Sequence, residues 1–225
     1  MLRPRKKVTK HEIQEDALVT FYLKAQKFFR VHSQKVYIAI GAVAVLAVVA
    51  VFMARSKKDA EFRAADRLGI AEQFYYAQDF QRAIPEMQQI IDTFPGTRSA
   101  GTATFLLANA YFSTGNVDQA KNHFQSYLDR YKHFEVFTAS SYAGIAACLD
   151  IQGHYREAAA SFEKAAKAFP KSFLAPFHLK DAARCFTIAG DIAKAREIYS
   201  KITTDYRNSS IAQDASFYLE SLSLN

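Results

Sequence analysis

The chain has 225 residues, of which 50% are apolar and 23% are charged, so it can form one or two domains with an apolar core. With 8 glycines and 5 prolines, it is neither collagen-like nor of low complexity. Two cysteines and six scattered histidines exclude a disulfide-rich scaffold and a dense zinc module.

The net charge of +7 is unevenly distributed along the chain. Residues 1–58 contain 12 Lys and Arg but only three acidic residues, which leaves 17 basic and 19 acidic residues in 59–225. A nucleic-acid-binding domain is expected to carry its basic surface on the folded part of the chain. We therefore expect no nucleic-acid partner.

Residues 1–35 form a basic arm that contains an amphipathic helix. Phe21, Lys24 and Phe28 recur at helical spacing within it. A basic amphipathic helix beside a membrane lies on anionic lipid or docks on a membrane protein. The sequence leaves both roles open.

Residues 36–54, VYIAIGAVAVLAVVAVFMA, are predicted to form a transmembrane helix. They contain no charged residue, are apolar on all sides and would make a helix of about 28 Å. The run is longer than the apolar region of a signal peptide. Nine Lys and Arg precede it and five follow it closely, which favours a cytoplasmic N-terminus with the C-terminal domain across the membrane. Residues 55–62 are expected to be a linker.

The remainder, residues 63–225, contains an internal repeat. The segments GNVDQA (115–120), GHYREA (153–158) and GDIAKA (190–195) place their alanines 38 and 37 residues apart, and a weaker first copy places Ala83 at the same position. Another alanine lies twelve positions before each of these, on a preceding apolar helix. This pattern predicts four helical hairpins with glycine in the turns, and residues 209–224 read as a closing helix.

The residues of the second and third copies carry a specific motif. It comprises Leu107, Ala108, Tyr111, Ala120 and Phe124, then Tyr142, Ile145, Ala146, Gly153, Tyr155, Ala158, Phe162, Ala165 and Pro170. The motif resembles the tetratricopeptide repeat (TPR) family. The resemblance implies an all-α fold, in which a single transmembrane helix is followed by a TPR-like α-solenoid of four hairpins and a C-terminal capping helix.

The ends of the repeats lead to three local expectations. Thr97, Ser172 and Ser209 are placed to cap the helices that follow them. The junction at residues 131–134 lacks both a proline and a hydroxyl cap, so we expect a looser elbow there. Pro85 lies beyond the first turn of its helix and is expected to kink or fray it.

The polar residues do not form a recognisable catalytic or ligand-binding pattern. There is no nucleophile constellation, no glycine-rich phosphate loop and no metal-ligand spacing, so we expect no enzyme activity, cofactor, metal or small-molecule substrate. Cys148 and Cys185 occupy equivalent repeat positions and are expected to be two buried thiols. Surface positions are expected for four histidines, which are His123, His133, His154 and His178.

The TPR resemblance also implies where a partner binds. The first helix of each hairpin lines the concave face of such a solenoid, which takes up peptide segments of other proteins. Because Asn109 lies two repeats away from Lys180 and Arg184, a carboxylate clamp for chaperone C-termini is not expected. The groove positions carried over from the family are Glu72, Tyr75, Tyr76, Phe105, Asn109, Phe112, Asp150, Phe177, Lys180 and Arg184.

The layout of the whole chain is similar to the YfgM-like family of ancillary SecYEG translocon subunits. That resemblance implies a bacterial inner-membrane protein whose periplasmic domain acts as a scaffold for partners, among them the Sec translocon, or as a chaperone-like adaptor for unfolded exported clients. Two alternatives stay open. The protein is a fixed structural subunit of an envelope assembly or secretion complex, or, with reversed topology, a cytosol-facing import receptor.

Overall fold

The computed structural model describes residues 10–222, and within this range the chain is helical with no β-strand. Contacts within the chain divide it into two compact units, with the boundary between Ser56 and Lys57. The helices are α1 (Lys10–Tyr76), α2 (Phe80–Thr93), α3 (Arg98–Ser113), α4 (Val117–Arg130), α5 (Glu135–Ile151), α6 (Tyr155–Ala168), α7 (Ala175–Ile188), α8 (Ile192–Asp205) and α9 (Ile211–Ser221). The four-hairpin solenoid with a closing helix is confirmed.

The first unit consists of the N-terminal part of α1. The helix is interrupted at His32, whose backbone angles (φ −115°, ψ 19°) are not helical. Beyond that kink lies the uncharged run of residues 36–54, which makes α1 long and apolar enough to cross a membrane. Its side chains are exposed on all sides, as the 68% exposure of Leu46 illustrates. Residues 1–9 of the basic arm lie outside the described residues.

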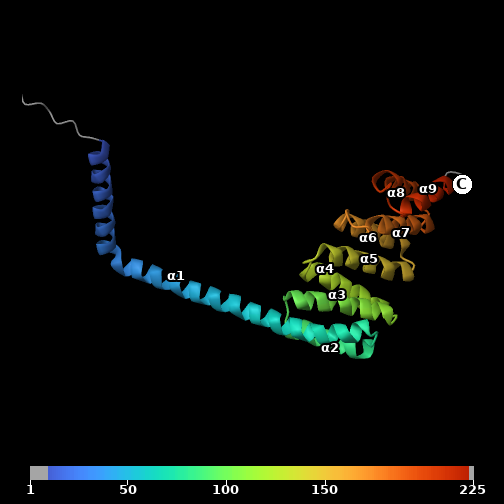
Figure 1. Ribbon diagram of the computed structural model, residues 1–225, viewed down its shortest axis with the longest axis horizontal. Helices are drawn as coiled ribbons and strands as arrows, with labels where there is room; N and C mark the ends of the chain where they lie inside the picture. Colours follow the sequence, from blue (N-terminus) through green and yellow to red (C-terminus); the bar gives the residue numbers. More distant parts are fainter. Residues whose placement is uncertain (1–9, 223–225) are drawn as a thin grey trace, which may run out of the picture. The chain divides into compact units, whose positions relative to one another are not determined.

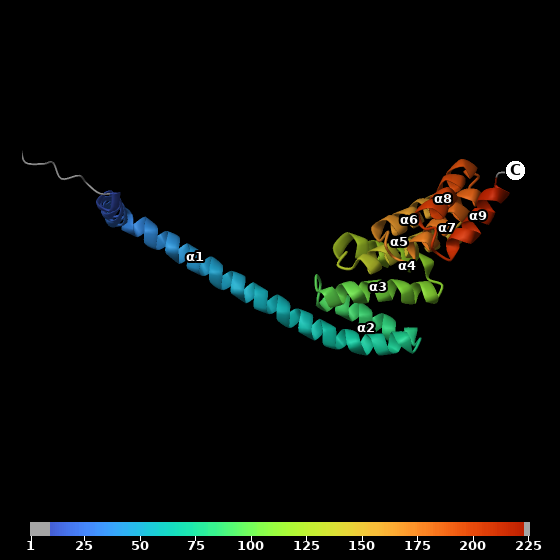
Figure 2. The same cartoon turned by 45° about the horizontal axis from the view of Figure 1, so that its top comes forward.

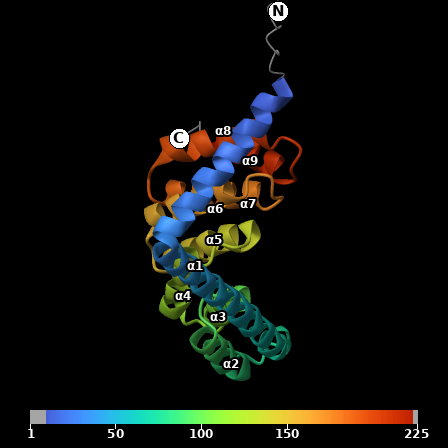
Figure 3. The same cartoon turned by 90° about the vertical axis from the view of Figure 1, so that its left-hand side faces the viewer.

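The second unit is built from helical hairpins. The last turns of α1 pair with α2, and α3–α4, α5–α6 and α7–α8 follow, each helix packing against the next. Figures 1 and 2 show these helices as successive layers, and Figure 3 shows the same stack from the side. Helix α9 closes the stack against α7 and α8.

Small side chains allow the paired helices to approach closely. Ala71 and Ala83 in the first hairpin are fully buried, and so are the equivalent alanines of the other three hairpins, Ala108, Ala120, Ala146, Ala158, Ala183 and Ala195. Larger apolar side chains fill the space on either side of these crossings, among them Met87, Leu107 and Ile198. The repeated alanines therefore lie where the two helices of each hairpin pack together, as expected from their spacing in the sequence.

The turn of each hairpin requires a left-handed backbone. Gly115, Gly153 and Gly190 have φ between 77° and 79°, a region that glycine enters without a steric penalty. In the first repeat the same position is occupied by Gln78, which has φ 60°. The first turn is therefore strained where the other three are relaxed.

The junctions between hairpins differ from expectation in several places. Thr97 accepts a hydrogen bond from the backbone N–H of Ala100 at 3.1 Å, which confirms it as the cap of α3. Ser172 accepts instead from the N–H of Leu174, because α7 begins only at Ala175. The side chain of Ser209 makes no hydrogen bond in the described structure. The caps predicted at Ser172 and Ser209 were therefore wrong.

A carboxylate provides an additional cap at α3. One oxygen of Glu61 accepts from the N–H of Arg98 at 2.6 Å, and the other accepts from the N–H and hydroxyl of Ser99 at 3.1 and 2.6 Å. Burial alone would raise the pKa of Glu61, but these hydrogen bonds and the nearby charge of Arg98 lower it overall. Glu61 thereby ties the first hairpin to the second.

Aromatic packing fills the α4–α5 junction. Phe134 and Phe137 stand 5.4 Å apart between ring centroids, and the hydroxyl of Tyr127 accepts from the N–H of Phe134 at 3.4 Å. Lys132 turns the chain with φ 46°. This junction is thus held by aromatic side chains in place of the proline and hydroxyl cap that it lacks.

Two further segments are more regular than expected. Helix α2 runs from Phe80 to Thr93 through Pro85, so the expected fraying is not present. Residues 55–62, expected as a linker, are helical and belong to α1. Glu61 lies within that segment, and its contacts with the N-terminus of α3 favour an ordered helix there.

Candidate partner-binding surface

The predicted groove residues lie on the first helix of each hairpin, as the repeat register requires. Three come from the end of α1, three from α3, one from α5 and three from α7. Their surroundings differ strongly along the stack.

The N-terminal end of the groove is aromatic and open. Tyr76 is 73% exposed, whereas Tyr75 is half-buried, with its ring centroid 5.4 Å from Tyr76 and 5.9 Å from Phe80. Glu72 lies one turn earlier and is half-buried, and this burial raises the pKa of its carboxyl. An apolar or aromatic ligand group can contact Tyr76 without displacing any protein side chain.

The middle of the groove is engaged in packing between repeats. Phe105 stacks on Phe137 of α5 with a centroid distance of 4.5 Å and meets Phe124 and Tyr127 edge-on at 6.0 Å. The side-chain amide of Asn109 donates to the carbonyl of Phe105 at 2.8 Å. Phe112, half-buried, packs against the core. These three side chains therefore stabilise the solenoid, and little of their surface is available to a ligand.

The C-terminal end of the groove is charged, and its charges are paired. Arg184 of α7 donates to the two carboxylate oxygens of Asp150 of α5 at 2.6 and 3.4 Å. This hydrogen bond raises the pKa of Arg184, whereas burial raises the pKa of the adjacent Asp181 carboxyl. Lys180 lies 3.8 Å from Asp214 of α9. The basic side chains predicted at this end of the groove thus form ion pairs between neighbouring helices.

Sequence reasoning missed a row of exposed apolar residues. Ile151 and Ile188 are 62% and 51% exposed, and each lies five residues after the repeating alanine of its helix, as Tyr76 does. Ser113 occupies this position in the second repeat. We call Tyr76, Ser113, Ile151 and Ile188 the groove row. The repeat period itself was the signal that could have identified the two isoleucines. Phe177, also exposed, stands apart on the first turn of α7.

The titratable side chains of residues 19–222 do not assemble a metal site. No three His, Cys, Asp or Glu side chains among residues 19–222 are placed to hold a metal ion. His123 stacks on Tyr111 at 5.3 Å and His178 is half-buried, so the expected surface positions of these two histidines were wrong. Burial lowers the pKa of both imidazoles, in the case of His178 against the opposing effect of Asp181.

Both cysteines are buried free thiols, as expected. Burial raises the pKa of Cys148 and of Cys185 to about 11. Because the thiolate is the reactive form, we expect both residues to react slowly at neutral pH.

The comparisons with known proteins agree with this architecture. The sequence profile of the tetratricopeptide repeat-like domain family matches residues 26–223. The chain belongs to this family. No curated protein matches the sequence at a significant level.

Solved structures show the same fold at low sequence identity. RapI in its apo form superposes with a TM-score of 0.61 and 16% identity over 72% of this chain and 47% of RapI. The repeats of a putative kinesin light chain from Podospora anserina give 0.56 and 14% over 72% and 85%. A Rap protein complexed with competence and sporulation factor gives 0.50 and 20% over 74% and 47%. The fold is that of a protein-interaction scaffold, and the chain spans about half the length of the Rap proteins.

Proposed function

We propose that the protein is a membrane-anchored adaptor that binds segments of other proteins through the groove row of its TPR-like solenoid. The single observation that carries the proposal is the row itself. Three of its four residues are apolar and more than half exposed, and they recur at one position of the repeat, whereas the buried apolar side chains of the domain form two cores. Exposed aromatic and aliphatic side chains in register along a solenoid are typical of a surface that binds a peptide.

The membrane anchor is residues 36–54. Exposing some nineteen apolar side chains to water is strongly unfavourable, and a helix of this length matches the apolar thickness of a bilayer. The greater number of Lys and Arg before the span favours an N-terminus in the cytoplasm and a solenoid in the periplasm.

The cellular setting follows from the resemblance in layout to the YfgM-like family. We propose that the protein resides in the bacterial inner membrane and acts at or near the Sec translocon. There the groove row receives unfolded exported chains or translocon-associated partners. Such clients are rich in apolar side chains that have not yet been buried, which suits a groove of exposed Tyr and Ile.

Site-specific photo-crosslinking in living cells tests this proposal. A photoreactive residue at Ile151, which is exposed in the middle of the groove row, is expected to crosslink translocon subunits and a range of exported proteins. A single partner crosslinked at a fixed ratio would instead identify a structural subunit of an envelope complex. The same probe at Ser140, on the same helix outside the row, is the control for proximity alone.

A further inference from the structure

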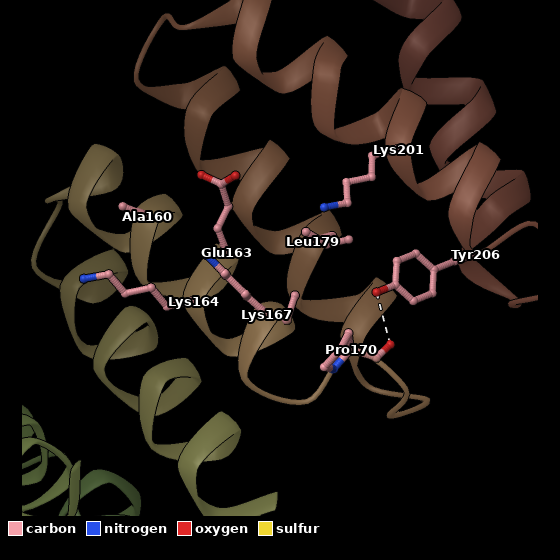
Figure 4. Close-up of a pocket in the computed structure, with 9 residues that line it drawn as sticks. Ala160, Glu163, Lys164, Lys167, Pro170, Leu179, Lys201 and Tyr206 are labelled. Carbon is pink, nitrogen blue, oxygen red and sulfur yellow. Dashed lines mark hydrogen bonds between the residues drawn. The ribbon is translucent and has the colours of Figure 1, made fainter. Parts of the chain in front are cut away.

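The convex face of the solenoid contains a pocket that the groove does not use. It is a hollow of about 520 Å³ between α6 and α8, and the side chain of Leu179 from α7 lies at its floor. Figure 4 shows its walls. On one side Tyr206 donates a hydrogen bond through its hydroxyl to the carbonyl of Pro170 at 3.1 Å, which fixes the ring along the wall.

The pocket exists because one side chain is smaller here than in the preceding repeats. Ala166 lies eight residues after the repeating alanine of its hairpin, where the second repeat has Leu128 and the first has Ile91. Leu128 is buried and belongs to the apolar core of its own repeat. Replacing a leucine by an alanine leaves a hollow unless the surrounding helices collapse. They have not done so between α6 and α8.

The same internal comparison shows that the charge at this place is reversed. Lys167 stands where the first two repeats have Asp92 and Asp129. Lys201 stands six residues after its repeating alanine, where those repeats have Gln89 and Ser126. The solenoid, residues 63–225, contains 17 basic and 17 acidic residues, so the two lysines beside this hollow are a local concentration of positive charge.

Both lysines border the pocket and are free to bind. In Figure 4 Lys201 extends from α8 towards Leu179, and Lys167 lies on the opposite wall formed by α6, whereas Lys164 points away. Neither Lys167 nor Lys201 forms an ion pair with the side chains of residues 19–222. Glu163, also on the rim, lies 4.0 Å from Lys194.

We infer that this pocket is a second docking site, which binds an acidic segment of a partner protein with one apolar side chain seated between flanking carboxylates. The apolar side chain would contact Ala166, Leu179 and the ring of Tyr206, and the carboxylates would pair with Lys167 and Lys201. A pocket of this volume encloses a side chain of leucine or phenylalanine size. None of the residues that line this pocket belongs to the groove row, so binding there does not depend on that row.

The same features favour a peptide over a lipid surface or a nucleic acid. Phosphate backbones and anionic bilayers are bound by extended basic surfaces. Here two lysines flank a hollow that also has a carboxylate, Glu163, on its rim. A recessed apolar floor between two cations matches alternating acidic and apolar side chains.

Fluorescence polarisation with the full chain in neutral maltoside micelles tests the inference. The probe is a fluorescein-labelled peptide of alternating Glu and Leu, and its Gln-Leu counterpart measures binding without charge. The double variant Lys167→Asp/Lys201→Ser introduces the residues found at these positions in the second repeat. Arg130→Ser/Arg156→Asp changes the net charge equally at exposed arginines away from the pocket. Ala166→Leu fills the hollow while keeping both lysines.

We expect the Glu-Leu peptide to bind at least about tenfold more tightly than the Gln-Leu peptide, and the lysine double variant to remove that difference. Ala166→Leu should weaken binding by a similar factor, and the arginine control should change it less than about twofold. Thermal melting confirms that each variant is folded. If Ala166→Leu fails to fold, the lysine pair still tests the site.

Three results would overturn the inference. One is equal binding of the two peptides, or no binding of either. Another is an equal loss of affinity in the arginine control, which would mean that only net charge matters. The third is displacement of the peptide by short-chain phosphatidylglycerol at the peptide's own concentration, which would assign the pocket to anionic lipid.

Discussion

The ring of Phe124 occupies the space that a Cβ atom on Gly144 would need, with its Cζ and Cδ2 atoms 2.5 and 2.7 Å from that position. Phe124 lies on α4 and Gly144 on α5, so this contact joins the second hairpin to the third. It is the closest such contact at any glycine among the described residues. The absence of a side chain at Gly144 thus determines how closely two repeats stack.

We predict that Gly144→Ala destabilises the solenoid. The added methyl group must displace a buried phenylalanine, and overpacking of this kind costs about 1–3 kcal/mol. Thermal or urea unfolding of the full chain in micelles measures the change. Gly69→Ala is the control, since a Cβ there meets nothing within 4 Å, and it should be neutral or stabilising. Equal effects of the two substitutions would contradict this account of the interface.

The first turn offers the opposite prediction. Gln78 has φ 60°, whereas the equivalent residues of the other repeats are glycines. We expect Gln78→Gly to stabilise the folded chain by about 0.5–1 kcal/mol, because glycine adopts the left-handed conformation without steric strain. The greater flexibility of glycine in the unfolded chain offsets part of this gain. Gly115→Ala is the reciprocal variant and should destabilise by about 1 kcal/mol. A melting temperature of Gln78→Gly below that of the parent chain would contradict the claim that Gln78 is strained.

Glu61 makes stability depend on pH in the acidic range. Its carboxylate accepts three hydrogen bonds at the start of α3, and its pKa lies below the usual 4.5. A lowered pKa in the folded state gives stability that is fully present above the unfolded pKa and is lost as pH falls through the folded pKa. We expect Glu61→Gln to cost about 1 kcal/mol at neutral pH.

Melting temperatures measured over a range of pH separate the effect of the Glu61 charge from a loss of packing. The difference in melting temperature between the parent and Glu61→Gln should shrink as the pH is lowered from neutral to well below 4.5, because the parent carboxylate becomes protonated. Asp66→Asn, on the same helix and exposed, should show no such convergence. A pH-independent difference would mean that the charge of Glu61 does not matter.

The topology can be tested with a thiol probe. Ser113 is the exposed serine of the groove row, and both native thiols are buried. We expect a membrane-impermeant maleimide to label Ser113→Cys in cells whose outer membrane alone has been permeabilised. The parent chain should stay unlabelled, since burial raises the pKa of both cysteines to about 11. Labelling only after the inner membrane is lysed would place the solenoid in the cytosol.

The sequence was sufficient to predict the fold because the repeat is local. Each hairpin carries its own alanine pair and its own turn, and a period of 37–38 residues aligns them. The groove was predicted less well, because its residues contact neighbours one repeat away. Phe105 packs on Phe137, and Arg184 pairs with Asp150, 34 residues earlier in the chain. A motif that describes one repeat contains no information on such contacts.

The cap at α3 illustrates the same limit. Thr97 was predictable because a cap acts within three residues, from Thr97 to Ala100. Glu61 acts on Ser99 across 38 residues, and nothing in the segment around Glu61 indicates this partner. The groove row, by contrast, could have been found from the repeat period alone. Ile151 and Ile188 each lie five residues after the repeating alanine of their helix, as Tyr76 does.

The most direct test of the adaptor account replaces the three apolar residues of the groove row with serine, the residue that the second repeat has at this position. The variant Tyr76→Ser/Ile151→Ser/Ile188→Ser alters only exposed side chains and should melt like the parent. Affinity purification from mild detergent with quantitative mass spectrometry then compares partner recovery. Val136→Ser/Phe173→Ser, which removes exposed apolar groups outside the row, is the matched control. We predict at least about a tenfold loss of partners for the groove variant and none for the control, as expected for interface anchors. Unchanged recovery from a folded groove variant would contradict the assignment of this face as the binding surface.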